Sequence, residues 1–106
     1  MDQELKAKWV TALRSGEYKQ TKYKLHRKGS NNFCCLGVLC KVFGLELTED
    51  GEDVVSGPVG ASYEACIYPL FSSDKVVADE QITPLIRLND EGEPFSAIAD
   101  YIEKNL

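Results

Sequence analysis

Three of the four cysteines in this chain, Cys34, Cys35 and Cys40, lie within seven consecutive residues. Clustered cysteines are typical of structural zinc sites, in which about four ligands converge on one ion. The surrounding apolar residues predict a helix, however, and adjacent side chains on a helix diverge by about 100°. Side chains five residues apart, such as those of Cys35 and Cys40, diverge by about 140°. The three thiols therefore cannot share an ion, and we expect no metal site.

A thiol nucleophile is the second kind of chemistry that this cluster could perform. Thiolates are stabilised at helix N-termini, and Cys34 and Cys35 open the predicted helix. Residues 35–39, CLGVL, resemble the Cys-x-Gly-Leu-Val pattern that opens a helix in papain-like cell-wall amidases. Those enzymes supply a histidine base after the cysteine, whereas the single histidine here, His26, precedes it. We therefore assign no catalytic residue and interpret the cysteines as core, with Cys34 or Cys35 and His26 as the catalytic alternative.

A basic segment that contains tyrosines, Glu17–Lys28, precedes the cysteines. Cations interleaved with aromatic rings can bind phosphates and stack on a planar base. The competing interpretation is an exposed edge strand that its lysines protect from aggregation. For a binding role, the candidate ligand-binding residues are Tyr18, Lys22, Tyr23, Lys24, Arg27 and Lys28.

The charges of the chain are unevenly distributed. The net charge is −5, yet residues 1–31 carry eight Lys and Arg against three Asp and Glu. Residues 41–106 carry four against fourteen. Such an acidic body would repel duplex nucleic acid, so we do not expect that partner. A small anionic ligand or nucleotide, or an acidic protein surface, suits the basic segment better, unless the two halves simply attract each other.

Length and composition indicate one ordinary globular domain. The 106 residues are 43% hydrophobic and 27% charged, and we expect them to form a single domain over residues 1–106. No apolar run approaches the roughly 18 residues of a membrane span. The N-terminus, MDQELKAKW, has no secretory signal pattern, which predicts a cytoplasmic protein with reduced thiols. No phosphate-cradling glycine loop occurs, and we expect no cofactor.

The elements that position these residues can be predicted from periodicity. Apolar residues at helical spacing predict a helix over Asp2–Ser15. The alternation over Glu17–Lys28 predicts a short exposed or edge strand, or an extended loop. The cysteines belong to a predicted helix over Phe33–Phe43, with Asn32 as its N-cap and Gly44 as its end. Gly37 keeps this helix slim, so that a neighbour can approach it.

The second half of the chain has weaker signals before its last helix. Short strands are expected at residues 54–59 and 64–71, and a short helix at residues 81–88 with Pro84 near its start. Residues 89–92, NDEG, predict a turn, and Pro94–Asn105 predicts an amphipathic helix. The result is an α+β fold. About three helices and a small irregular sheet are expected, with the cysteine helix packed between the first and last helices.

Three blocks of the sequence together resemble a family of small, largely uncharacterised proteins from bacteriophages and prophage regions. The blocks are residues 9–20 (WVTALRSGEYKQ), residues 33–40 (FCCLGVLC), and residues 88–92 (LNDEG) followed by Phe95 and residues 98–103 (IADYIE). The resemblance implies an accessory protein in the cytoplasm of the infected bacterial host cell. From that context we hypothesise a role in host take-over or counter-defence. Our leading interpretation is a non-catalytic protein that binds a host protein or a small anionic or nucleotide ligand through the basic segment. The alternative is a cysteine-dependent hydrolase or transferase that uses Cys34 or Cys35 with His26.

Overall fold

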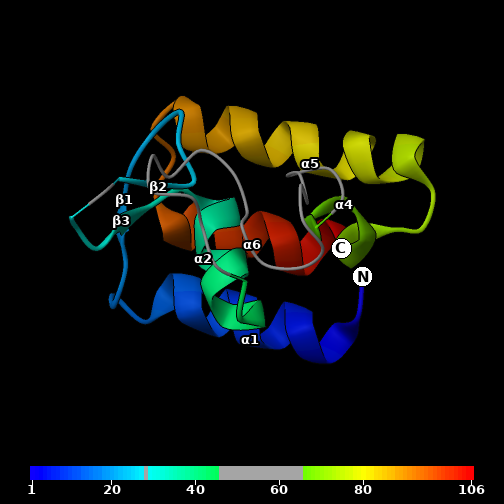
Figure 1. The fold of residues 1–106 in the computed structure, drawn as a ribbon, viewed down its shortest axis with the longest axis horizontal. Coiled ribbons are helices and arrows are strands. Elements are labelled where there is room, and N and C mark those ends of the chain that lie inside the picture. The colour runs from blue at the N-terminus through cyan, green and yellow to red at the C-terminus, as the bar shows by residue number, and fades with distance from the viewer. Residues whose placement is uncertain (28, 46–65) are drawn as a thin grey trace.

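A computed structural model describes residues 1–27, 29–45 and 66–106 of this chain. Its elements in these ranges form an α+β fold, as the sequence predicts (Figure 1). The elements are α1 (Gln3–Arg14), β1 (Lys19–Gln20), β2 (His26–Arg27), β3 (Asn32–Phe33), α2 (Cys35–Phe43), α4 (Tyr68–Phe71), α5 (Lys75–Asp90) and α6 (Phe95–Asn105). The strand expected at residues 54–59 lies outside the described residues.

The two helices nearest the ends of the chain agree with their predictions. The side chain of Asp2 caps α1 by accepting a hydrogen bond of 2.8 Å from the Leu5 N–H. Leu5, Trp9 and Leu13 are buried on the predicted apolar face. α6 likewise begins after Pro94, and its buried residues are Phe95, Ile98, Ala99 and Ile102. Strong local periodicity was sufficient to locate both helices.

The described part of the Glu17–Lys28 segment is neither the single strand nor the extended loop that its sequence predicts. The segment forms two strands of two residues each, β1 and β2, which a turn at residues 21–25 separates. Both pair with β3, which lies between them, parallel to β1 and antiparallel to β2. The chain must reverse at the turn because β1 runs parallel to β3 and β2 runs antiparallel to it.

The cysteine helix, α2, begins two residues later than predicted. Residues 32 and 33 are strand β3, so the N-cap of α2 is Cys34 and not Asn32. The helix ends at Gly44 as predicted, with a left-handed φ of 91°. The expected close approach occurs at Gly37, where a β-carbon would overlap the carbonyl oxygen of Leu25. This contact places the 21–25 turn directly against the first turn of α2.

The described part of the acidic half is more helical than predicted. The strand expected at residues 64–71 is instead the short helix α4 over its described part. The helix expected at residues 81–88 starts six residues earlier, because Asp74 caps it with hydrogen bonds to the N–H groups of Val76 and Val77. Pro84 therefore lies inside α5 and not near its start. The predicted 89–92 turn is also partly wrong, since its first two residues complete α5.

The helices pack in an order that differs from the prediction. α2 and α6 both lie between α1 and α5, whereas α2 was expected between the first and last helices (Figure 1). Trp9 of α1 is completely buried, and its indole N–H donates a hydrogen bond of 2.9 Å to the carbonyl oxygen of Cys35. No helix within the described ranges is both long and apolar enough to cross a membrane.

Candidate functional site

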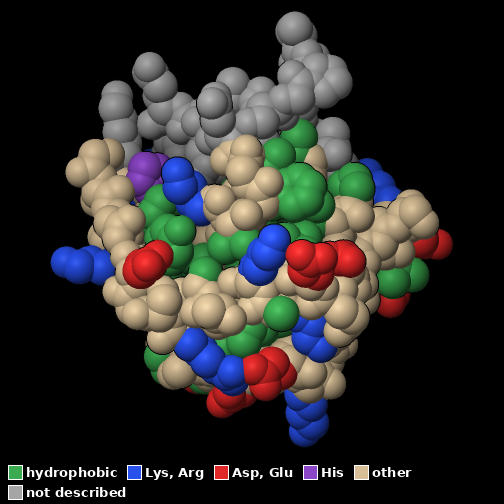
Figure 2. Space-filling view, turned by 90° about the horizontal axis from the view of Figure 1, so that it is seen from below, with side chains coloured by type: hydrophobic (Ala, Val, Ile, Leu, Met, Phe, Trp, Pro, Cys, Tyr) green, Lys and Arg blue, Asp and Glu red, His purple; other side chains and the backbone are tan. Residues whose placement is uncertain are grey.

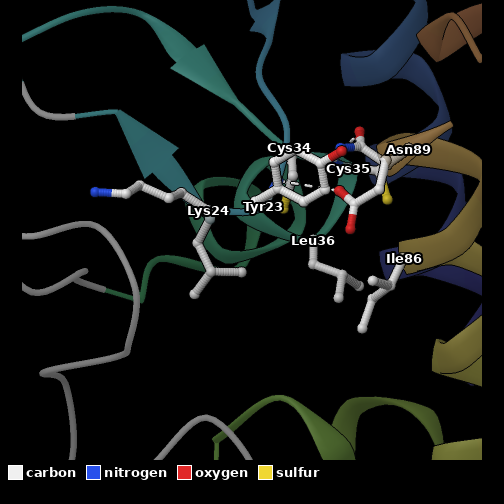
Figure 3. Close-up of a pocket in the computed structure, with 9 residues that line it drawn as sticks. Tyr23, Lys24, Cys34, Cys35, Leu36, Ile86 and Asn89 are labelled. Atoms are coloured by element: carbon white, nitrogen blue, oxygen red, sulfur yellow. Dashed lines mark hydrogen bonds between the residues drawn. The ribbon is translucent and has the colours of Figure 1, made fainter. Parts of the chain in front are cut away.

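A cavity of about 160 Å³ lies where the 21–25 turn, the start of α2 and the end of α5 meet (Figure 3). Its walls are largely apolar. The residues that matter most for its chemistry are Tyr23, Lys24, Cys34, Leu36, Ile86 and Asp90. Three elements far apart in the sequence are needed to build it.

Tyr23 forms the outer side of the cavity in an uncommon backbone conformation. Its φ is 68°, which makes it the one non-glycine residue with positive φ among the described residues. The side chain of Asp90 holds this conformation, because its Oδ1 atom accepts a hydrogen bond of 3.0 Å from the Tyr23 N–H. The Tyr23 ring remains 77% exposed, so burial of the ring does not explain its position.

Asn89 joins the three elements beneath the cavity. Its side chain is buried, and its Oδ1 atom accepts hydrogen bonds from the Cys35 N–H at 3.2 Å and the Gln20 side chain at 3.0 Å. Its amide nitrogen donates a hydrogen bond of 2.8 Å to the carbonyl oxygen of Thr21. One side chain thus fixes the sheet and the start of α2 against the end of α5.

Sequence reasoning missed Asn89 because it interpreted NDEG as a turn. A signal was nevertheless present in the helical spacing. Ile82, Leu85 and Asn89 follow an i, i+3, i+7 pattern, and all three are buried on one face of α5. A polar residue that continues an apolar stripe is a candidate for a buried hydrogen-bonding role.

Cys34, Cys35 and Cys40 lie in environments that raise the pKa of their thiols. Cys34 is half-buried at the cavity wall, and its sulfur accepts a hydrogen bond of 3.4 Å from the Gly37 N–H. Burial raises the pKa of Cys34 to about 11 and that of Cys40 to about 12. Burial also raises the pKa of Cys35 well above its ordinary value, and its thiol lies 3.7 Å from the carbonyl oxygen of Leu85. Desolvation here outweighs the stabilisation that a helix N-terminus offers a thiolate.

His26 is not brought together with these cysteines. Its ring stacks on Phe33 with 4.3 Å between centroids, and its Nε2 atom lies 2.7 Å from the carbonyl oxygen of Ser30. Phe33 and Cys34 are consecutive in extended backbone, so their side chains point to opposite sides. The histidine therefore occupies the face of the sheet away from the Cys34 thiol.

The described residues also lack a metal-binding constellation. In the ranges 1–27, 29–45 and 66–106, no group of three or more His, Cys, Asp or Glu side chains is arranged to hold an ion. None of the four cysteines forms a disulfide bond. The angular divergence of side chains around a helix accounts for the separation of Cys35 from Cys40.

The candidate ligand-binding residues do not converge on one site. Tyr18 packs edge-on against Phe33, with 5.3 Å between ring centroids. The Arg27 side chain donates a hydrogen bond of 3.4 Å to the hydroxyl of Thr21. Lys22 extends toward Gly92, at the turn before α6. Lys28 lies outside the described residues.

Tyr23 and Lys24 are the two candidate residues that line the cavity. The Lys24 side chain extends away from the other labelled residues, so its ammonium group does not point into the cavity (Figure 3). Figure 2 shows a face of the molecule on the α1 side, where Lys and Arg side chains are scattered among Asp and Glu. Neither view gathers the cations into a single anion-binding patch.

One comparison with known proteins gives a match. The family described as Domain of unknown function (DUF8296) matches residues 1–67, which is more than half of the chain. The match includes Tyr23 and Cys34 of the cavity, whereas Ile86 and Asp90 follow it. No curated protein and no solved structure matches the chain. The family match is sufficient to establish that this protein belongs to the DUF8296 family.

Proposed function

We propose that this protein is a non-catalytic, phage-type accessory protein that binds a host protein through the surface around the cavity. We call this surface the anchor surface, and define it by Tyr23, Leu36, Ile86 and Asp90. The observation that carries the proposal is the conformation of Tyr23.

A solvent-exposed tyrosine with positive φ is unfavourable for folding. The left-handed conformation of a non-glycine residue costs on the order of 1–3 kcal/mol, and the exposed Tyr23 ring contributes little burial to offset it. Such strain is frequent at sites where a side chain has a binding role. Tyrosine is also enriched among the residues that dominate protein–protein affinity. The neighbouring Ile86 is 41% exposed and adds apolar area beside the ring.

The size of the cavity favours a protein partner over a free small molecule. Sites for drug-sized ligands are typically about 300–1,000 Å³, which is larger than the 160 Å³ present here. A cavity of about 150 Å³ accommodates a group the size of benzene, which is comparable to one amino-acid side chain. An exposed aromatic ring beside a pocket for one side chain is the usual anatomy of an interaction hot spot.

The phage context rests on the three sequence blocks. Two of them contribute to the cavity, since residues 33–40 include Cys34 and Leu36, and residues 88–92 include Asn89 and Asp90. This overlap supports a shared binding role for the resembling proteins. A partner in the cytoplasm of an infected bacterial host cell, bound for take-over or counter-defence, fits that role.

The test is affinity capture from a bacterial host lysate on the immobilised protein. We expect a host protein that the wild type retains and that Tyr23→Ala loses. Val76→Ala is the matched control, because Val76 is 67% exposed on α5 and does not line the cavity. Circular dichroism melting shows that each variant is folded. Equal retention by Tyr23→Ala and the wild type would remove the anchor surface as the binding site.

A further inference from the structure

Three kinds of chemistry meet in the cavity of the anchor surface. Asp90 supplies a carboxylate, Tyr23 supplies the face and edge of an aromatic ring, and Leu36 and Ile86 supply aliphatic walls. Together these groups match one class of partner side chain.

The Asp90 carboxylate retains capacity to bind a cation. One oxygen, Oδ1, accepts the Tyr23 N–H, and among the described residues no hydrogen bond is found for Oδ2. An ionised carboxylate can accept about four hydrogen bonds, so most of this capacity is unused. Asp90 is also the last residue of α5, where the helix dipole disfavours negative charge. A cation beside Asp90 would use the remaining acceptor capacity of the carboxylate and would offset the unfavourable interaction of its charge with the helix dipole.

The negative charge of Asp90 acts within the cavity, because this residue lines it. After burial, which is the largest cause, the Asp90 carboxylate also contributes to the raised pKa of the Cys34 thiol at the cavity wall. Lys24 lines the cavity, but its ammonium group points away from the other labelled residues (Figure 3). It therefore does not neutralise the Asp90 charge within the cavity. An anionic group would therefore meet repulsion on entering the cavity.

Lysine and arginine side chains have an aliphatic stem and a cationic end. The stem packs on apolar walls while the charged end binds a carboxylate. A cation over the face of a tyrosine ring gains a further cation–π attraction. The volume of about 160 Å³ admits one such side chain.

We propose that the cavity receives a lysine or arginine side chain from the host protein partner. Asp90 is its counter-ion, Tyr23 covers the cation, and Leu36 and Ile86 flank the stem. This inference rests on the proposed function, and it identifies the partner surface as one that presents an exposed cationic residue.

The test uses small probes and NMR amide shifts of the full chain. The probes are the Nα-acetyl methylamides of lysine and arginine, with the norleucine derivative as an uncharged aliphatic control. We expect saturable shifts at Tyr23, Leu36 and Asp90 with the cationic probes and not with norleucine. Asp90→Asn keeps an oxygen for the Tyr23 N–H and removes the charge, and we expect it to weaken lysine binding about tenfold or more.

Glu80→Gln is the matched control for the change in net charge. Glu80 is exposed on α5, ten residues and hence about 15 Å along the helix from Asp90. Its substitution should leave the probe affinity unchanged. Equal binding of norleucine, unchanged affinity in Asp90→Asn, or the absence of saturable shifts at the cavity would each overturn the inference.

Failure of the inference can be distinguished from failure of the proposed function. If the captured host protein is lost by Tyr23→Ala but retained fully by Asp90→Asn, the anchor surface binds a partner without a cationic side chain. If Tyr23→Ala retains the host protein, the proposed function itself is wrong. Loss of the host protein in Tyr23→Ala and in Asp90→Asn, with retention in Glu80→Gln, supports the proposed function and the inference of a cationic side chain.

Discussion

The carbonyl oxygen of Leu25 occupies the place that the β-carbon of residue 37 would need, and Gly37 leaves that place free. The same carbonyl accepts a hydrogen bond of 3.1 Å from the Cys34 N–H. The turn that carries Tyr23 is thereby held directly on the first turn of α2. This contact brings together two of the elements that line the cavity, the 21–25 turn and the start of α2.

Gly37→Ala should destabilise the protein by about 2 kcal/mol or more, because the added methyl group meets backbone that cannot rotate away. The measurement is urea unfolding followed by circular dichroism. Gly16→Ala is a matched control, since Gly16 has a φ of 79° but open space around it, and it should cost only about 1–2 kcal/mol. A smaller loss at residue 37 than at residue 16 would show that the close approach is not rigid.

Tyr23→Asn should stabilise the protein while it abolishes partner capture. Asparagine tolerates the left-handed conformation better than tyrosine does, and the exposed ring contributes little to folding. We expect a gain of up to about 1 kcal/mol in the free energy of unfolding. Thermal melting and the capture assay together test this prediction. A lower melting temperature would instead assign the ring a structural role.

Asn89→Leu should destabilise the protein by about 3 kcal/mol or more. It removes the hydrogen-bond partners of the Cys35 N–H and the Thr21 carbonyl, and each buried group left unpaired costs about 1–3 kcal/mol. The Gln20 side chain loses one of its two bonds and keeps the one that it donates to the Glu93 carbonyl. Urea unfolding provides the measurement. The control is Asn105→Leu, where the amide makes an exposed bond to the Tyr101 carbonyl, and the expected change is under about 0.5 kcal/mol.

The stability should fall as the pH rises above about 9. The folded state raises the pKa of Cys34 to about 11 and of Cys40 to about 12 from an ordinary value of 9.0. The unfolded thiols therefore lose protons first, so the free energy of unfolding is fully retained below pH 9 and decreases through the folded pKa values. Urea unfolding at several pH values tests this. In Cys34→Ser the decrease between pH 9 and 11 should be smaller, because that thiol no longer titrates.

Local signals in the sequence were sufficient for α1, α6 and the glycine end of α2. Each depends on residues that are neighbours along the chain, such as Asp2 with Leu5 or Gly44 with Cys40. The separation of Cys35 from Cys40 could also be predicted from the sequence, because the divergence of side chains around a helix is a local property.

The cavity could not be predicted, because it depends on pairing between distant residues. The 17–28 segment was interpreted as one strand or an extended loop, since nothing local indicates that β3 will pair with both of its ends. The positive φ of Tyr23 depends on Asp90, which lies 67 residues later. The basic residues appeared to be a patch in the sequence, but the turn between β1 and β2 directs Lys24 and Arg27 to different neighbours.

The hydrogen bonds of Asn89 also distinguish the length of the family match from the length of chain that this fold requires. The family match ends at residue 67, yet the side chain that satisfies Gln20, Thr21 and Cys35 comes from α5, beyond that end. A fragment cut at residue 67 would expose the buried surfaces of α1 and α2 and leave three polar groups without partners. The segment that matches the family is therefore shorter than the segment that this fold requires.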